Sequence, residues 1–131
     1  MQYVLLIYER AESFEKRERP ADDAAWGPWR AYHQALLQAG VYLGGSPLTD
    51  PSTTATTVRI RGGERQVQDG PFADTKEQLG GFIILELPTL DAALEWASRC
   101  PAAEYGAVEV RPAADLTQVL GSTCGPKGLP Q

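Results

Sequence analysis

The sequence predicts an α+β fold of the ferredoxin-like kind, in which helices cover one face of an antiparallel sheet. Segments typical of strands and helices follow one another in the order β-α-β, then a β-hairpin, then β-α-β. Two such units with right-handed crossovers form one antiparallel sheet, so the hairpin is an insertion between them. The chain has 131 residues, which suffice for one domain with its own core.

The first β-α-β unit is expected within the first 45 residues. Residues 2–8 are apolar on both faces, as in a central strand, and residues 9–23 are charged, so we expect a loop or an imperfect helical turn there. A helix follows, and it begins either at Gly27-Pro28 or near Ala21 with a kink at that proline. A short strand, 41–45, ends the unit. The stripe that predicts the helix consists of Trp29, Tyr32, His33, Leu36, Leu37 and Gly40.

A hairpin and an unusual turn occupy the middle of the chain. Residues 54–61 and 64–68 alternate as strands do and are joined at Gly62-Gly63. The following stretch, Asp69-Gly70-Pro71-Phe72, predicts an ordered corner because its aspartate, glycine and proline all favour turns. We expect Phe72 to plug this loop into a core, which would hold the Asp69 carboxylate still.

The second unit begins with an apolar strand over residues 80–87. Thr89 is expected to cap a helix that runs through Cys100, and a last strand covers 105–111. Residues 115–120 can form one helical turn, and 121–131 resemble a mobile tail. We therefore expect a domain over residues 1–113 and a C-terminal tail over 114–131. Several strands are apolar on both faces, whereas helices cover one, which predicts a homodimer packed sheet to sheet.

Composition narrows the class of protein. With 12 basic and 17 acidic residues, the net charge of −5 disfavours nucleic acid as a partner. The sequence contains no apolar run of the ~20 residues that cross a bilayer. Cys100 and Cys124 suit reduced thiols in the cytoplasm, although they also permit one disulfide. One histidine, two distant cysteines and no acidic cluster disfavour a metal site, and Gly44-Gly45-Ser46-Pro47 matches no nucleotide-binding motif, so no cofactor is expected.

Two long motifs identify a family. The run from Asp69 to Phe82 (DGPFADTKEQLGGF) and the run from Leu90 to Ala97 (LDAALEWA) closely resemble the DGPF-motif subgroup of the YCII-related proteins. The resemblance covers residues 1–113 and implies a ferredoxin-like fold of the dimeric α+β barrel type. It also implies an enzyme with a His and an Asp near one cavity, which carry over to His33 and Asp69; one relative is a dehydrochlorinase acting on a hydroxylated aromatic. Proximity of such genes to extracytoplasmic-function sigma factors implies a stress or regulatory context.

The chemistry that follows is proton transfer. Imidazole accepts and returns a proton near neutral pH, and a carboxylate bonded to its second nitrogen fixes its tautomer. We therefore predict that His33 and Asp69 line one cavity of about 300 Å³ or more and act on a small polar or hydroxy-aromatic substrate as an isomerase or lyase. The cavity candidates are Trp29, Ser46, Phe72 and Lys76.

Structural interpretations compete with this hypothesis. A histidine on an apolar helical stripe is commonly a core residue with a satisfied hydrogen bond, and Asp69 in its turn is by default a turn former. At the level of function, the alternatives are a non-catalytic dimeric module that binds a ligand or a regulatory protein, and a fold without any site.

Overall fold

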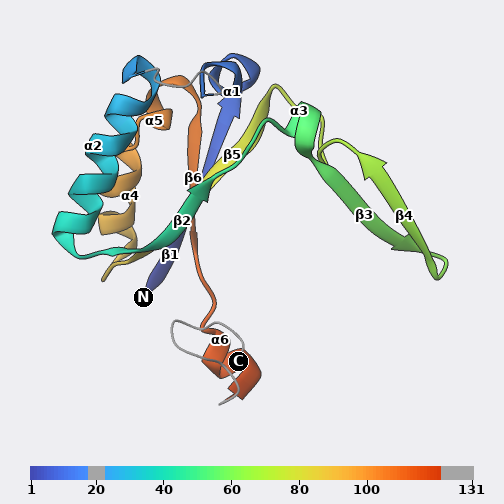
Figure 1. The fold of residues 1–131 in the computed structure, drawn as a ribbon. Coiled ribbons are helices and arrows are strands. Elements are labelled where there is room, and N and C mark those ends of the chain that lie inside the picture. Colours follow the sequence, from blue (N-terminus) through green and yellow to red (C-terminus); the bar gives the residue numbers. More distant parts are fainter. Residues whose placement is uncertain (18–22, 122–131) are drawn as a thin grey trace.

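The structure, a computed structural model, describes residues 1–17 and 23–121 and contains a four-stranded antiparallel sheet (Figure 1). Its order is β2-β5-β1-β6, with β1 at Gln2–Arg10, β2 at Tyr42–Pro47, β5 at Glu77–Glu86 and β6 at Ala107–Pro112. The main helices, α2 (Asp23–Ala39) and α4 (Leu90–Arg99), cover one face. This arrangement confirms the ferredoxin-like fold. The expected mobile tail lies outside the described residues apart from Gly121.

The core lies between this sheet and the two helices. Alternate residues of β1 point to the helices, so Tyr3, Leu5 and Ile7 are buried while the residues between them face the other side. Leu36 of α2 and Ala93 of α4 meet them and are fully buried. Val108 and Val110 of β6 share the helix side, as the alternation of this segment predicted.

Of the two forms expected over residues 9–23, a loop or an imperfect helical turn, the structure has a helix at residues 11–17. Strand β1 continues to Arg10, and a helix, α1 (Ala11–Arg17), follows it directly. Glu9 keeps the alternation of β1 and is buried, and Phe14 anchors α1 with a side chain that is also buried. The charged composition of this segment concealed these two inward positions.

The first long helix has the longer of its two expected forms. Helix α2 begins before Gly27-Pro28, so Pro28 lies inside it. It ends at Ala39, directly before Gly40 as expected, and the φ of +73° at Gly40 favours glycine because it lies in the left-handed region.

Short helices occur next to the strands, and two of them, α3 (Pro51–Thr54) and α5 (Ala102–Tyr105), were not predicted. Helix α3 is capped by Asp50, and α5 takes Tyr105 out of the last predicted strand. Helix α6 (Leu116–Leu120) falls within the predicted turn, and Thr89 caps α4 as expected. Across the described ranges, no helix combines the length and the apolar character that spanning a membrane requires.

The hairpin forms a sheet of its own. Strands β3 (Thr56–Arg61) and β4 (Glu64–Asp69) pair with each other and project from the side of the main sheet that faces away from α2 and α4 (Figure 1). Their exposed apolar side chains are Val58, Ile60 and Val67. An isolated two-stranded hairpin is only marginally stable in water, and these exposed side chains leave its apolar surface uncovered in the single chain.

Phe72 corrects a prediction. It does not plug into a core, because its side chain is 75 % exposed at the foot of the hairpin, outside the space between the main sheet and the helices. Its ring instead lies under the guanidinium of Arg59, 4.9 Å from the ring centroid.

A glycine packed on β1 provides a test of this fold. A Cβ atom at Gly106 would lie 2.1 Å from the carbonyl oxygen of Tyr8, so Gly106→Ala requires the backbone to move. We expect a loss of about 2–3 kcal/mol in the free energy of unfolding, measured by denaturant titration.

The matched control is Gly27→Ala in helix α2. No atom lies within 4 Å of the Cβ position there, so this variant should gain about 0.5–1 kcal/mol because alanine favours helix. Equal stability of Gly106→Ala and the parent protein would contradict the close packing described.

Candidate functional site

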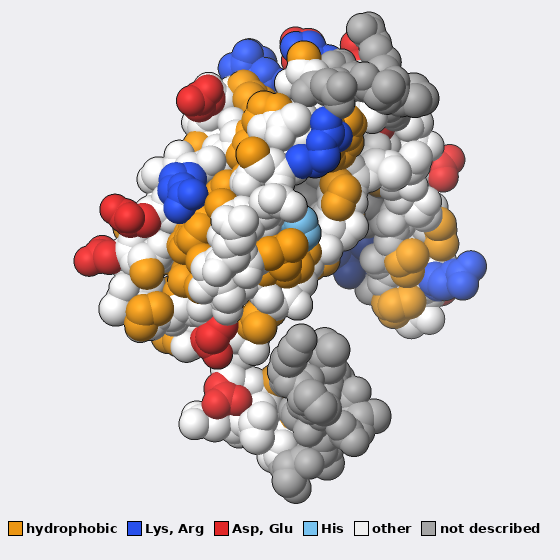
Figure 2. Space-filling view, turned by 60° about the vertical axis from the view of Figure 1, so that its left-hand side comes forward, with side chains coloured by type: hydrophobic (Ala, Val, Ile, Leu, Met, Phe, Trp, Pro, Cys, Tyr) orange, Lys and Arg blue, Asp and Glu red, His pale blue; other side chains and the backbone are white. Residues whose placement is uncertain are grey.

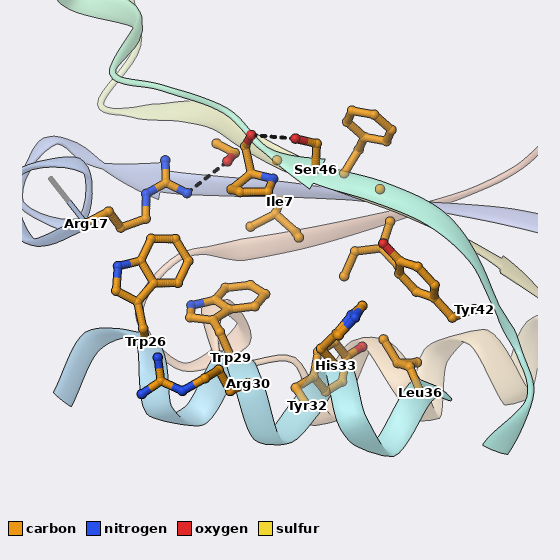
Figure 3. A pocket seen from close by; sticks show the side chains of 16 residues that line it. Ile7, Arg17, Trp26, Trp29, Arg30, Tyr32, His33, Leu36, Tyr42 and Ser46 are labelled. Carbon is orange, nitrogen blue, oxygen red and sulfur yellow. Dashed lines mark hydrogen bonds between the residues drawn. The ribbon is translucent and has the colours of Figure 1, made fainter. Parts of the chain in front are cut away.

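A pocket of about 290 Å³ opens between α2 and the strands β2 and β5, and we call it the α2 pocket. Trp26, Trp29 and His33 point from α2 towards the strands in Figure 3. Ile7 of β1 forms the inner wall, and Tyr42 of β2 lies at the other end from Arg17. The residues that face the cavity are mainly apolar and aromatic, as is typical of sites for small organic ligands.

His33 lies in the wall of this pocket and is exposed. Its ring contacts the ring of Tyr42 edge-on, with centroids 4.8 Å apart. Within residues 1–17 and 23–121 the imidazole takes part in no hydrogen bond or ion pair, so the interpretation of His33 as a satisfied core residue is wrong. Figure 2 shows this histidine at the surface among hydrophobic side chains. Its nitrogens can therefore meet a ligand.

Strand β2 closes the pocket with backbone more than with side chains. A Cβ atom at Gly45, whose φ is +156°, would lie 2.4 Å from the carbonyl oxygen of Phe82, so glycine allows β2 to approach β5 here. Ser46 and Pro47 then line the pocket, and the Ser46 hydroxyl donates a hydrogen bond to the Pro47 carbonyl at 2.9 Å. The edge strand β2 thus extends two residues beyond the strand predicted over 41–45.

The structure brings together three of the six predicted site residues: His33, Trp29 and Ser46 all line the α2 pocket. Asp69 instead ends strand β4, where it pairs with Thr56 across the hairpin, and it does not line this pocket. Phe72 lines a separate groove at the foot of the hairpin, and Lys76 is exposed beside it. No contact between His33 and Asp69 occurs within the described chain, so their pairing stays a prediction.

The sequence analysis missed a buried carboxylate next to the pocket. Glu9 is 0 % exposed, and its Oε2 atom lies 3.3 Å from Nη1 of Arg17, a pocket residue whose own side chain is 12 % exposed. Arg17 also donates hydrogen bonds to the carbonyl oxygens of Gly80 (3.0 Å) and Leu48 (2.7 Å). The alternation of β1, continued to position 9, was the signal that could have placed this glutamate inside.

The other oxygen of Glu9 belongs to a chain of hydrogen bonds. Tyr105 donates its hydroxyl to Oε1 at 3.1 Å, and the indole Nε1–H of Trp29 donates to the Tyr105 hydroxyl, also at 3.1 Å. Burial raises the pKa of Glu9, while the charge of Arg17 and the hydrogen bond from Tyr105 oppose that increase. Burial, together with the nearby Glu9 charge, raises the pKa of Tyr105 to about 12.

The structure gives less support to a cysteine nucleophile or a metal site. Burial raises the pKa of the Cys100 thiol to about 11, so this cysteine is protonated at neutral pH and is a poor nucleophile. In the part of the chain that the structure describes, no three His, Cys, Asp or Glu side chains cluster as metal ligands would.

The fold and the pocket together define a ferredoxin-like α+β domain with an apolar pocket beside its edge strand. Residues 1–117 match the YCII-related domain, and the chain belongs to this family. An uncharacterised protein of Rhizobium meliloti (strain 1021) is 36 % identical over 116 residues, which cover 87 % of this chain and 93 % of that protein.

A solved structure has the same fold. The 5-chloro-2-hydroxyhydroquinone dehydrochlorinase of Burkholderia phenoliruptrix AC1100, in complex with 2,5-dihydroxybenzoquinone, is similar with a TM-score of 0.50 and 19 % identity. The similarity covers 87 % of this chain and 94 % of the dehydrochlorinase.

The buried carboxylate predicts how stability depends on pH. The pKa of Glu9 is raised in the native state, so the native protein binds this proton more tightly than the unfolded chain does. The stabilisation from the bound proton is complete below the ordinary pKa of glutamic acid, about 4.3, and it is lost as pH rises through the pKa of Glu9 in the native state. The free energy of unfolding of the parent protein, minus that of Glu9→Gln, should therefore fall with increasing pH.

Denaturant titrations between about pH 4 and pH 8 measure this difference, because the glutamine does not titrate. Glu15→Gln, which removes an exposed negative charge from α1, serves as the control. A difference between the parent protein and Glu9→Gln that rises with pH would contradict the burial of Glu9.

Proposed function

We propose that this protein is a small cofactor-free enzyme in which His33 moves a proton on a small, planar, hydroxylated substrate bound in the α2 pocket. The observation that carries the proposal is an exposed imidazole, without a hydrogen bond among the described residues, in the wall of an apolar pocket of about 290 Å³. Imidazole can act there as base and then as acid near neutral pH. The reaction is an elimination or an isomerisation.

The walls of the pocket suit a planar ring that carries an oxygen anion. Trp26 and Trp29 offer aromatic surface, and Arg17 offers a cation that stays charged at any physiological pH. The two hydrogen bonds of Arg17 to carbonyl oxygens use two of the five guanidinium N–H groups. The guanidinium can therefore also stabilise the negative charge that develops on a substrate oxygen when His33 removes a proton.

The similar dehydrochlorinase supports a hydroxylated ring as the substrate class, since its structure holds 2,5-dihydroxybenzoquinone. In such an elimination the imidazole takes a proton from a ring hydroxyl of the keto tautomer. The electrons of the broken O–H bond form a carbonyl through the conjugated ring, and chloride leaves the saturated ring carbon with the electron pair of the carbon–chlorine bond. This chain provides a base for the first event in His33 and a cation for the developing oxyanion in Arg17.

We also propose a homodimer formed through the open face of the sheet. Val4, Leu6, Phe82 and Ile84 alternate with the core positions of β1 and β5, so they lie on the face opposite the helices, and their half-buried apolar side chains favour a second layer. The hairpin projects on this same side with its exposed valines and isoleucine (Figure 1). A second chain seated between them would cover both surfaces.

The dimer also gives Asp69 its role in this proposal. Asp69 lies at the foot of the hairpin and does not line the α2 pocket of its own chain, so in this proposal the carboxylate that serves His33 comes from the second chain. We further propose that the protein belongs to the DGPF-motif subgroup, because it contains the motif from Asp69 to Phe82. We also propose that it is cytoplasmic, because the free thiol of Cys100 suits a reducing compartment.

Ligand binding is tested with 2,5-dihydroxybenzoquinone as the probe. In ¹H–¹⁵N NMR spectra the indole signals of Trp26 and Trp29 and the signals of the sole histidine should shift on titration. The indole of Trp96 is the internal control because it lies outside the pocket, with Arg99 4.2 Å from its ring centroid. Shifts confined to Trp96, or no shifts at all, would show that the α2 pocket is not the site.

Catalysis is tested by chloride release from 5-chloro-2-hydroxyhydroquinone. Replacement of a general acid and base costs about 10²–10⁴ in rate, so His33→Gln should lose at least about a hundredfold while the probe still binds. If Asp69 serves His33, Asp69→Asn should lower the rate and the double variant should fall no further. A probe that binds without any turnover, unchanged in His33→Gln, would favour the alternative of a ligand-binding module in a regulatory context.

Sedimentation equilibrium tests the dimer. The parent protein should have twice the chain mass of 14.2 kDa, and Ile84→Glu should convert it to a monomer because a charge on the open face opposes burial of that face. Leu94→Glu, on the exposed outer side of α4, is the matched control and should remain a dimer. A monomeric parent protein would remove this part of the proposal.

A further inference from the structure

The buried Glu9 is the one fully inaccessible charged side chain in the described ranges, and it touches the α2 pocket only through other residues. A carboxylate removed from water is costly unless charges or hydrogen bonds compensate it. Its two oxygens are connected to different residues of the pocket wall, Oε2 to Arg17 and Oε1, through Tyr105, to Trp29.

Oxygen Oε2 leads to Arg17. The guanidinium lies 3.3 Å away and is also fixed by the carbonyl oxygens of Gly80 and Leu48, so α1 is tied to β5 and to the segment after β2. A Cβ atom at position 80 would lie 2.9 Å from Oε2, so glycine is needed for the carboxylate to reach this place. No hydrogen bond from the described chain reaches Oε2, which leaves the charge of Arg17 as its compensation.

Oxygen Oε1 leads to Trp29 through the hydroxyl of Tyr105. Tyr105 comes from α5, at the far end of the sequence, yet its hydroxyl is both the donor to Glu9 and the acceptor of the Trp29 indole. The indole of Trp29 therefore has a defined orientation in the pocket wall. The indole has a single hydrogen-bond donor, so this bond specifies which edge of the ring faces Tyr105.

The titratable groups that face Glu9 come from three elements. Arg17 of α1 and Tyr105 of α5 contact it directly, and the thiol of Cys100, which follows α4, interacts with it through space. Helix α2 contributes Trp29 by way of Tyr105, and β5 contributes the backbone at Gly80. Glu9 is therefore the shared partner of the cation and the indole that line the pocket.

We propose that Glu9 is a positioning residue of the α2 pocket, whose two oxygens hold the guanidinium of Arg17 and, through Tyr105, the indole of Trp29 in the places where a ligand meets them. The inference deepens the proposed function and rests on it for the identity of the ligand. The coupling between Glu9 and Trp29 is a property of the free protein, so it can be tested without a ligand.

The test follows the indole ¹H–¹⁵N signals of the protein while pH is varied without a ligand. The Trp29 signal should move with the titration of Glu9, because a proton on the carboxyl weakens its bond from Tyr105 and thereby alters the acceptor of the indole. This movement should vanish in Glu9→Gln and persist in Glu15→Gln. The Trp96 signal should follow no such titration in any of the proteins.

A second variant keeps the test decisive if Glu9→Gln does not fold. Tyr105→Phe removes the link without changing charge. The Trp29 signal of this variant should therefore differ from that of the parent protein at every pH, and it should no longer change with the titration of Glu9. A Trp29 signal that ignores pH in the parent protein, or that titrates unchanged in Tyr105→Phe, would overturn the proposal.

The consequence for binding is measured with 2,5-dihydroxybenzoquinone. Tyr105→Phe should weaken its affinity by about fivefold, the worth of one net hydrogen bond, with Tyr3→Phe, whose hydroxyl is no part of this chain, as the control. An unchanged affinity would overturn the positioning role. If the parent protein does not bind the probe, the proposed function fails while the coupling of Glu9 to Trp29 is still decided by the titration.

Discussion

The ion pair between Glu9 and Arg17 is the constraint that orders the region around the pocket. A buried carboxylate without a partner would cost several kcal/mol, so the chain must bring a cation to it, and α1 does so directly after β1. The same constraint requires glycine at position 80, where any side chain would meet Oε2 of Glu9 and the ring of Phe14. Through the hydrogen bonds of Arg17 to the carbonyl oxygens of Gly80 and Leu48, this pair connects α1 with β5 and with the segment after β2.

The pocket exists because the layer of helices does not reach the edge of the sheet evenly. Strand β2 is the edge strand, and its pairing with β5 has a register shift between Tyr42 and Gly44. Its two glycines, Gly44 and Gly45, have no side chains that could fill the space towards α2. Large residues of α2, Trp26 and Trp29 among them, stand over this strand without filling the space completely. Close packing elsewhere, as between Leu5, Leu36 and Leu85, makes this gap a local feature of one edge.

Most of the fold could be predicted from the sequence because its signals are local. Alternation in β1, the stripe of α2, Thr89 before α4 and the two glycines of the hairpin each depend on neighbouring residues alone. The site was predicted in part: His33 and Trp29 share a helical stripe, so their common location followed from spacing. The contacts of Glu9 with Tyr105 and of Tyr105 with Trp29 span 96 and 76 residues, and no local pattern reports such pairs.

The same limit explains the misplaced residues of the DGPF motif. An Asp-Gly-Pro turn predicts a corner, which the structure contains at the foot of the hairpin, but it does not predict which side of the sheet the corner occupies. Phe72 was expected inside because large aromatic residues are commonly buried, whereas the hairpin carries it away from the main sheet and helices. Its exposure and that of the hairpin valines have one cause, the separation of this second sheet from the first.

All residues that line the α2 pocket precede position 84, and α4, α5 and β6 contribute none of them. The first β-α-β unit supplies most of this lining, and the second enters it through one strand, β5, at residues 80–83. Substitutions along α2 and β2 can therefore change the lining of the pocket while the packing of α4 on the sheet is kept. Beyond β5, Tyr105 is the place where a change in the second unit reaches the pocket, because its hydroxyl accepts the hydrogen bond of the Trp29 indole.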